Sequence, residues 1–288
     1  LHGYYLNVKI LFEYLKKADK KVVWTLHDCW AFTGHCANFQ YPVCDKWKTG
    51  CFDCERKTKY PKSFVDNSQK NYLEKERVFC GVKNLTVVTP SEWLARLVKE
   101  SFLGRYPTKV INNGIDTSVF CPTESDFKER NGLKDKKMIL GVANVWDEFK
   151  GINDFIGLSK KISDDYRIVL VGLDEKQLGM LPENILGITR TNNTKELAEI
   201  YTAADVLFNP TYEDNYPTVN LEAQACETPV VTYDTGGSGE SVPKENVIAA
   251  GDVDAFLNLE KSQLKVKYID KRDKSLFIDK YLKLYHER

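Results

Sequence analysis

Two acidic side chains stand eight positions apart in a stretch whose residue types suit a phosphorylated ligand. Asp214 follows an apolar run typical of a strand, and Glu222 lies in the helical pattern that comes next. Pro217 suits the first position of that helix, because its φ is preset and its missing N–H is not needed there. Thr218 and Val219 would then carry free N–H groups beside the positive end of the helix dipole. We therefore predict an anion site for a diphosphate at this helix start.

The two acids would contact the sugar parts of such a ligand. Glu222 lies four residues after Thr218, on the same edge of the helix, where it can accept hydrogen bonds from ribose hydroxyl groups. Asp214 would meet the transferred sugar from the loop above. The alternative is a capping acid and a solvated helix acid. Gly236 and Gly237 follow the next strand pattern, and would let the backbone approach the ligand closely.

Four motifs give this stretch a family context. The acidic pair is followed by LEAQACETPVV and a TGG turn, and the other motifs are INNGID at 111–116, GVANVWDEFKG at 141–151 and ELAEIYTAADV at 196–206. Together, and in this order, they resemble the retaining GT-B glycosyltransferases of family four. The resemblance covers nearly the whole chain. It implies an α/β fold with two Rossmann-like, doubly wound domains that face a cleft.

The resemblance also assigns roles to single residues. Lys150 would neutralise the donor diphosphate, since a departing nucleoside diphosphate accumulates negative charge; the alternative is a surface lysine at a helix start. His27 would contact the donor sugar, or else would only cap its strand and bond to Asp28. On the acceptor side we place Asp28, Trp30 and Phe32, because aromatic faces pack well on sugar rings.

The full predicted site can be stated as two sets. The catalytic residues are His27, Asp214 and Glu222. The donor-binding residues are Asn144, Lys150, Arg190, Asn215, Tyr216, Pro217, Thr218, Val219, Gly236 and Gly237.

Two positions depart from the family pattern. Many relatives carry an arginine near the positions of Trp146 and Phe149, and this chain has none there. Arg190 is a candidate substitute for that second cation. Glu213 stands one residue too early for the seven-residue gap, so Asp214 takes the aligned place with a shorter side chain.

These side chains must be held at the carboxyl ends of parallel strands. Strand patterns occur at 22–26, 85–88, 109–111, 138–142, 167–171, 185–188, 206–209, 229–233 and 247–250. Helical patterns separate most of them, which predicts parallel sheets with helices on both faces.

We expect three parts along the chain. Residues 1–130 would form the acceptor-side domain, 131–272 the nucleotide-sugar domain, and 273–288 a terminal helix that packs back on the first domain. Family members begin with a strand and a Gly-rich loop, whereas this chain opens in a helical pattern. We therefore expect the first part of the N-terminal domain to be missing.

Four cysteines in the loop 29–54 are a separate signal. Cys36, Cys44, Cys51 and Cys54 follow the spacing C-x7-C-x6-C-x2-C, and the last two form the close pair typical of a zinc knuckle. A structural zinc ion, reduced free cysteines and disulfides are the alternatives. A catalytic zinc is disfavoured, because four thiolates leave no open position.

Composition limits the function classes. With 42% hydrophobic and 28% charged residues the chain has a globular composition, and 41 basic residues balance 41 acidic ones. No basic field suggests nucleic acid as a partner, and no apolar run approaches the ~20 residues of a membrane span. We expect a cytoplasmic protein; peripheral contact with the inner face of the plasma membrane stays open.

The resemblance implies transfer, with retention, of a sugar from a nucleoside diphosphate donor of UDP or GDP type to a glycan or lipid-linked acceptor in polysaccharide biosynthesis. The leaving phosphate would take the acceptor's proton, so no catalytic cofactor is expected. The first alternative is an inactive fragment that binds nucleotide-sugars without the Gly-rich loop. An epimerase would need paired acids around the sugar carbon, and a phosphorylase a pyridoxal phosphate lysine; we find a place for neither.

Overall fold

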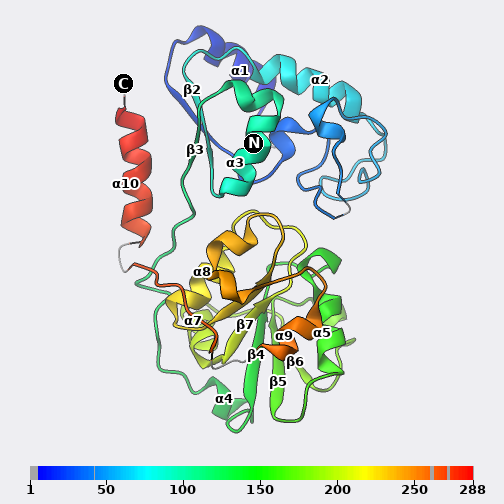
Figure 1. Cartoon of the computed structure of the whole chain (residues 1–288), viewed down its shortest axis with the longest axis vertical. Helices are drawn as coiled ribbons and strands as arrows, with labels where there is room; N and C mark the ends of the chain where they lie inside the picture. The colour runs from blue at the N-terminus through cyan, green and yellow to red at the C-terminus, as the bar shows by residue number, and fades with distance from the viewer. Residues whose placement is uncertain (1–5, 42, 260–262, 271–272, 288) are drawn as a thin grey trace. The chain divides into compact units, whose positions relative to one another are not determined.

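The chain folds into two compact units (Figure 1). The computed structural model describes residues 6–41, 43–259, 263–270 and 273–287. Unit 1 comprises the residues up to Asn112 together with those from Asp279 onward, and unit 2 runs from Asn113 to Ile278. Unit 1 is therefore built from two separate stretches of sequence.

Unit 1 contains a parallel sheet in the order β1 (Val22–Thr25), β2 (Leu85–Thr89), β3 (Thr108–Val110). Helix α1 (Val8–Lys17) precedes the sheet, and the segments between its strands form η1 (Trp30–Phe32), η2 (Lys46–Lys48), α2 (Ser68–Phe79), α3 (Glu92–Glu100) and η3 (Phe102–Arg105). Aromatic rings make up much of its core: Phe12 packs against Trp24 and Phe79, with ring centroids 5.1 and 4.7 Å away.

Unit 2 is a doubly wound parallel sheet in the order β6-β5-β4-β7-β8-β9. Its strands are β4 (Lys137–Val142), β5 (Tyr166–Val171), β6 (Ile185–Ile188), β7 (Val206–Asn209), β8 (Val230–Tyr233) and β9 (Val247–Ile248). Its helical segments are α4 (Phe127–Arg130), η4 (Glu148–Lys150), α5 (Ile152–Ser159), α6 (Glu175–Leu178), α7 (Thr194–Ala203), α8 (Thr218–Ala225), η5 (Ser238–Ser241), η6 (Lys244–Asn246) and α9 (Val253–Asn258).

Alternate residues of each strand in unit 2 enter different cores, because successive side chains point to opposite faces of a sheet. Met138 and Leu140 belong to the core that includes residues of α4, α7 and α8. Ile139 belongs to the other core, with Phe155 of α5 and Phe256 of α9. Figure 1 shows α7 and α8 on one side of the strands and α5 and α9 on the other. Both faces are covered, which explains the continuous apolar runs of these strands.

The strands match the positions predicted from sequence, with small differences at their ends. β8 begins at Val230 instead of Pro229. Proline has no N–H to donate to the ladder, although the Pro229 carbonyl still accepts a hydrogen bond from Leu207. β9 ends at Ile248, two residues earlier than the predicted Ala250.

The segment between the two sheets belongs to unit 2. The predicted domain boundary lay near residue 130, whereas the structure groups residues 113–130 with unit 2. Phe127 is buried in the core of unit 2, and the Phe120 ring lies 6.1 Å from that of Tyr201. Apolar burial therefore sets this boundary.

The terminal helix α10 (Asp273–His286) contributes to both units. At its start, the Asp273 carboxylate accepts a hydrogen bond from the Ile115 N–H at 2.8 Å. Towards its end, the Tyr281 and Thr25 hydroxyl groups lie 3.0 Å apart, and Glu287, just beyond the helix, pairs with Lys109. Among the helices of the described residues, none is both long enough and apolar enough to span a membrane.

Gly172, just after β5, lies in close contact with the neighbouring backbone. Its φ is +98°, and a Cβ built there would lie 1.7 Å from the backbone oxygen of Ala143. Gly172→Ala should therefore destabilise unit 2 by about 3 kcal/mol or more in urea unfolding. The matched control is Gly157→Ala within α5, where a Cβ meets open space and should be neutral or stabilise by up to about 1 kcal/mol. Equal stabilities of the two variants would contradict the described packing.

Candidate functional site

The candidate site lies at the carboxyl edge of the unit 2 sheet, where the strand order reverses. Strands β4 and β7 are neighbours in this sheet, although β5 and β6 separate them in sequence. Crossovers therefore leave β4 towards one side of the sheet and β7 towards the other. Such a switch point is where ligands of open α/β sheets bind.

Backbone hydrogen bonds fasten the loops at this edge to one another. The Tyr212 N–H in the loop after β7 donates to the Phe149 carbonyl in the loop after β4, at 2.8 Å. The Gly237 N–H in the loop after β8 donates to the Asp214 carbonyl at 3.2 Å. The predicted glycine loop is thus held directly against the predicted acidic loop.

Lys150 and Asp214 form an ion pair between the first two of these loops. The Lys150 Nζ lies 2.6 Å from Asp214 Oδ2. Their side chains are 36% and 21% exposed, so a ligand can reach both. Hydrogen bonds hold both residues: the Asp147 Oδ1 atom accepts the backbone N–H of Lys150 at 2.9 Å, and the Asn215 N–H donates to Asp214 Oδ1 at 2.8 Å. A cation and a carboxylate are therefore held side by side.

Helix α8 begins beside this pair, one residue later than predicted. Pro217, expected at the first helical position, is the N-cap with ψ 124°, and Thr218 is the first helical residue. An extended ψ keeps the proline outside the helix. No side chain caps the first turn, since proline offers no acceptor. The first-turn amides and the exposed Thr218 keep the character of an anion site.

Glu222 is held by a residue that the sequence analysis did not single out. Its Oε2 accepts a hydrogen bond from the Tyr201 hydroxyl of α7 at 2.9 Å. Burial raises the pKa of Glu222, and hydrogen bonds from Tyr201 and Thr218 act in the opposite direction. Tyr201 lies within the ELAEIYTAADV motif, but the motif does not indicate that its hydroxyl group supports Glu222.

A buried polar network connects α8 to the loop after β8. Asn220 accepts a hydrogen bond from Asn209 of β7 and donates to the Ser241 hydroxyl, both at 2.9 Å. Gln224 donates to the Asn220 and Ser241 carbonyl groups at 2.7 and 2.9 Å. The sequence offered one signal for this network, namely polar residues on the inner face of a helix.

The other predicted donor residues have different surroundings. The Tyr216 ring is buried in a cluster with Ile115 and Leu221, so side-chain packing occupies it. Val219 packs, half-buried, on a core of unit 2. Asn144 is exposed in the loop after β4. Arg190 is exposed after β6, which β5 separates from β4 in the sheet.

The predicted acceptor-side residues lie in unit 1, after β1. His27 is exposed, and Asp28 Oδ1 accepts the Trp30 N–H at 2.9 Å. The prediction that Phe32 lines a ligand pocket needs correction: its side chain is fully buried in the core, 5.4 Å from the Trp47 ring. An aromatic side chain next to an apolar strand packed inward, where it removes more surface from water.

Lys75 of α2 supports the segment after β1. Its Nζ donates to the carbonyl groups of Trp30 and Thr33 at 2.7 and 2.9 Å and lies 3.6 Å from the Trp30 ring centroid. Burial lowers the pKa of Lys75 to about 7, against the opposing effect of Cys51, Asp28 and Cys36. The lysine therefore fixes Trp30 from inside the unit.

Comparison with known proteins relates most of unit 2 to a protein family. Residues 136–259 match the family model for glycosyl transferases group 1. The chain carries a group 1 glycosyltransferase domain. It is 25% identical over 275 residues to the putative colanic acid biosynthesis glycosyl transferase WcaC of Escherichia coli K12, covering 92% of this chain and 66% of that protein. A D-inositol 3-phosphate glycosyltransferase of Stackebrandtia nassauensis is 31% identical over 144 residues, which are 43% of this chain and 32% of that one.

Solved structures confirm the predicted fold. HepE from Anabaena in complex with UDP matches with a TM-score of 0.63 at 17% identity, covering 94% of this chain and 71% of that one. Sucrose-phosphate synthase from Thermosynechococcus elongatus matches with a TM-score of 0.64 at 20% identity, covering 77% and 63%. The chain therefore has a Rossmann-like α/β fold of GT-B type. The chain spans two thirds or less of the length of the curated relatives described above.

The raised pKa of Glu222 predicts a pH effect on stability. Above its ordinary value of 4.5, the folded protein keeps a proton that the unfolded chain has released. The free energy of unfolding should therefore fall as the pH rises through the raised value. Glu222→Gln keeps the shape and removes this titration. Urea unfolding from about pH 4 to about pH 8 should show the wild type losing stability relative to the variant.

The matched control for this experiment is Glu227→Gln, which changes an exposed carboxylate just beyond α8. Its pH profile should follow that of the wild type. Parallel profiles for the wild type and Glu222→Gln would contradict the described surroundings of Glu222.

Proposed function

We propose that this protein transfers a sugar, with retention, from a nucleoside diphosphate donor to a glycan or lipid-linked acceptor in polysaccharide biosynthesis. The observation that carries the proposal is the Lys150–Asp214 pair beside the start of α8. This arrangement offers a cation, a carboxylate and backbone N–H donors within one short stretch of surface. A sugar diphosphate presents groups that match all three.

The proposed reaction breaks the bond between the anomeric carbon and the phosphate oxygen. Negative charge then develops on the leaving phosphate, where Lys150 and the first-turn amides of α8 would stabilise it. Positive charge develops on the sugar ring, which Asp214 would face. Because Nζ and Oδ2 are 2.6 Å apart, the scissile bond would lie where both groups can reach it. The leaving phosphate would take the acceptor's proton, so positioning and charge are the protein's contribution.

Glu222 would hold the nucleotide. One of its oxygens is committed to Tyr201, so the carboxylate is oriented before a ligand arrives. A pre-oriented acceptor loses little freedom when ribose hydroxyl groups donate to it. For His27 the proposed role is contact with the donor sugar, and for Asp28 and Trp30 it is acceptor binding. Lys150 and the helix start supply the charge that a divalent ion would otherwise provide.

The relatives support the donor class. HepE was solved in complex with UDP and with UDP-glucose, which favours a UDP-type donor here, with GDP as the alternative. The WcaC relative carries a colanic acid biosynthesis name, which favours a surface polysaccharide as the product. We further propose that the protein works in the cytoplasm, where nucleotide-sugars are made, with peripheral contact to a membrane that presents a lipid-linked acceptor.

Two variants distinguish the proposed roles of Lys150 and Asp214. Lys150→Ala should weaken UDP binding and lower sugar transfer by about 100- to 1000-fold, because it removes the cation at the leaving group. Asp214→Asn should lower transfer while UDP affinity stays equal or rises, because UDP has no sugar there and Lys150 loses a competing partner. Calorimetric titration with UDP and UDP release from a panel of nucleotide-sugars would measure these effects.

The matched control is Lys161→Ala, which removes a lysine that pairs with Asp254 outside the candidate site. It should retain both UDP binding and transfer. Equal loss of UDP binding in Lys150→Ala and Asp214→Asn would contradict the division of roles. Donor binding without transfer to any acceptor in the wild type would favour the alternative, a nucleotide-sugar-binding protein.

A further inference from the structure

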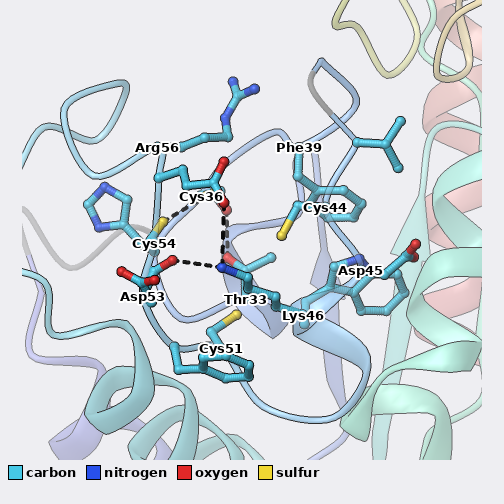
Figure 2. Close-up of a pocket in the computed structure, with 15 residues that line it drawn as sticks. Thr33, Cys36, Phe39, Cys44, Asp45, Lys46, Cys51, Asp53, Cys54 and Arg56 are labelled. Carbon is cyan, nitrogen blue, oxygen red and sulfur yellow. Dashed lines mark hydrogen bonds and ion pairs between the residues drawn. The ribbon is translucent and has the colours of Figure 1, made fainter.

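The loop that leaves the end of β1 contains a cysteine cluster for which the proposed transfer has no use. Cys36, Cys44, Cys51 and Cys54 line one hollow of about 200 Å³ in unit 1. In Figure 2 the Cys36 and Cys54 side chains lie together on one side of it, with Cys44 and Cys51 at separate places around it. Four soft ligands thus surround a single space, although the first and the last are eighteen positions apart in the sequence.

The closest two sulfur atoms have the spacing of metal ligands. Cys36 Sγ and Cys54 Sγ are 3.6 Å apart. Zinc–sulfur bonds of about 2.3 Å at tetrahedral angles place sulfur ligands about 3.8 Å apart. Among the described residues, no three side chains yet form a group that could hold an ion. Binding would therefore require Cys44 and Cys51 to turn towards the Cys36–Cys54 pair.

Backbone N–H groups already point at two of the sulfur atoms. The Gly34 N–H donates to Cys51 Sγ at 3.1 Å, and the Arg56 N–H donates to Cys54. Such donors stabilise a thiolate, which is the form that binds metal. Two of the four sulfur atoms thus already lie against backbone donors.

The loop around the cluster has little regular secondary structure. Between η1 and α2 it contains the short turn η2 and an isolated bridge between Gln40 and Val43, within the described residues. The Nε2 atom of His35, which lines the same hollow, is buried without a hydrogen-bond partner among the described residues. A loop of this length with so little regular secondary structure gains order from a cross-link.

We propose that Cys36, Cys44, Cys51 and Cys54 bind one structural Zn²⁺ ion. Four sulfur ligands favour a tetrahedral, soft site, and zinc is the divalent ion that such a site takes without redox chemistry. With all positions filled by thiolates, the ion has no place for a water or substrate, so it acts on the fold. It would anchor the loop next to Thr33, whose carbonyl accepts from Lys75. The ion thereby supports the segment that carries Trp30.

Metal analysis of the full chain tests the proposal. Protein purified under reducing conditions should contain about one zinc ion per chain by mass spectrometry. Cobalt exchanged into the site should give the thiolate charge-transfer bands and strong visible bands of a tetrahedral sulfur site. Removal of the metal with a chelator should lower the thermal midpoint, and zinc should restore it.

Variants separate the four ligands from other thiols. Cys51→Ser and Cys54→Ser should lose the zinc or bind it far more weakly. The matched control is Cys80→Ser, which changes a half-buried cysteine that bonds to the Phe102 carbonyl outside the loop. It should retain about one zinc ion. His35→Ala should also retain it, because His35 is not one of the proposed ligands.

Two results on the wild-type protein would overturn the proposal without relying on variants that fold. One is a metal-free protein whose four loop cysteines are alkylated readily under native, reducing conditions, before and after incubation with zinc. The other is a Cys36–Cys54 disulfide found by peptide mapping of rapidly alkylated protein, since an oxidised pair cannot bind zinc. Zinc loss that is equal in Cys80→Ser and Cys54→Ser would also contradict the assignment.

Discussion

The burial of β4 on both faces is the constraint on which the architecture of unit 2 depends. Its residues alternate between two apolar cores, so helices must cover the sheet on either side. The chain meets this requirement by building β5 and β6 on one side of β4 and then returning to place β7 on the other. The loops after β4 and β7 therefore leave the sheet in opposite directions from adjacent strands. Lys150 and Asp214 lie on these two loops, and contacts between the loops bring them together.

The electrostatics of the candidate site depend on the hydrogen bonds that hold its charged groups. Asp147 and the Asn215 amide orient Lys150 and Asp214, while Tyr201 orients Glu222. Helix α8 is also held by the buried network around Asn220, whose hydrogen bonds require a specific geometry that apolar packing would not impose. Hydrogen bonds from both backbone and side chains therefore hold the charged groups of the candidate site.

Much of this could be predicted from sequence, for a physical reason. Strands buried on both faces are continuous apolar runs, and their positions were predicted closely. Lys150 and Asp214, in the loops after β4 and β7, lie at the edge predicted for them because the topology of a parallel sheet brings such loops together. The contact between them depends on loop paths that no periodicity encodes. Side chains with ambiguous surroundings were harder: Phe32 packs into the core, and Tyr201 supports a carboxylate in a neighbouring helix.

The discontinuity of unit 1 has a consequence for the order of folding during synthesis. Residues from Asp279 onward belong to the same unit as the residues before Asn113, yet the ribosome makes them after the whole of unit 2. Thr25 and Lys109 must therefore wait for Tyr281 and Glu287 while the intervening 113–278 segment emerges and folds. Unit 2 can therefore form its native contacts first, whereas unit 1, whose strands are translated before unit 2, is completed last.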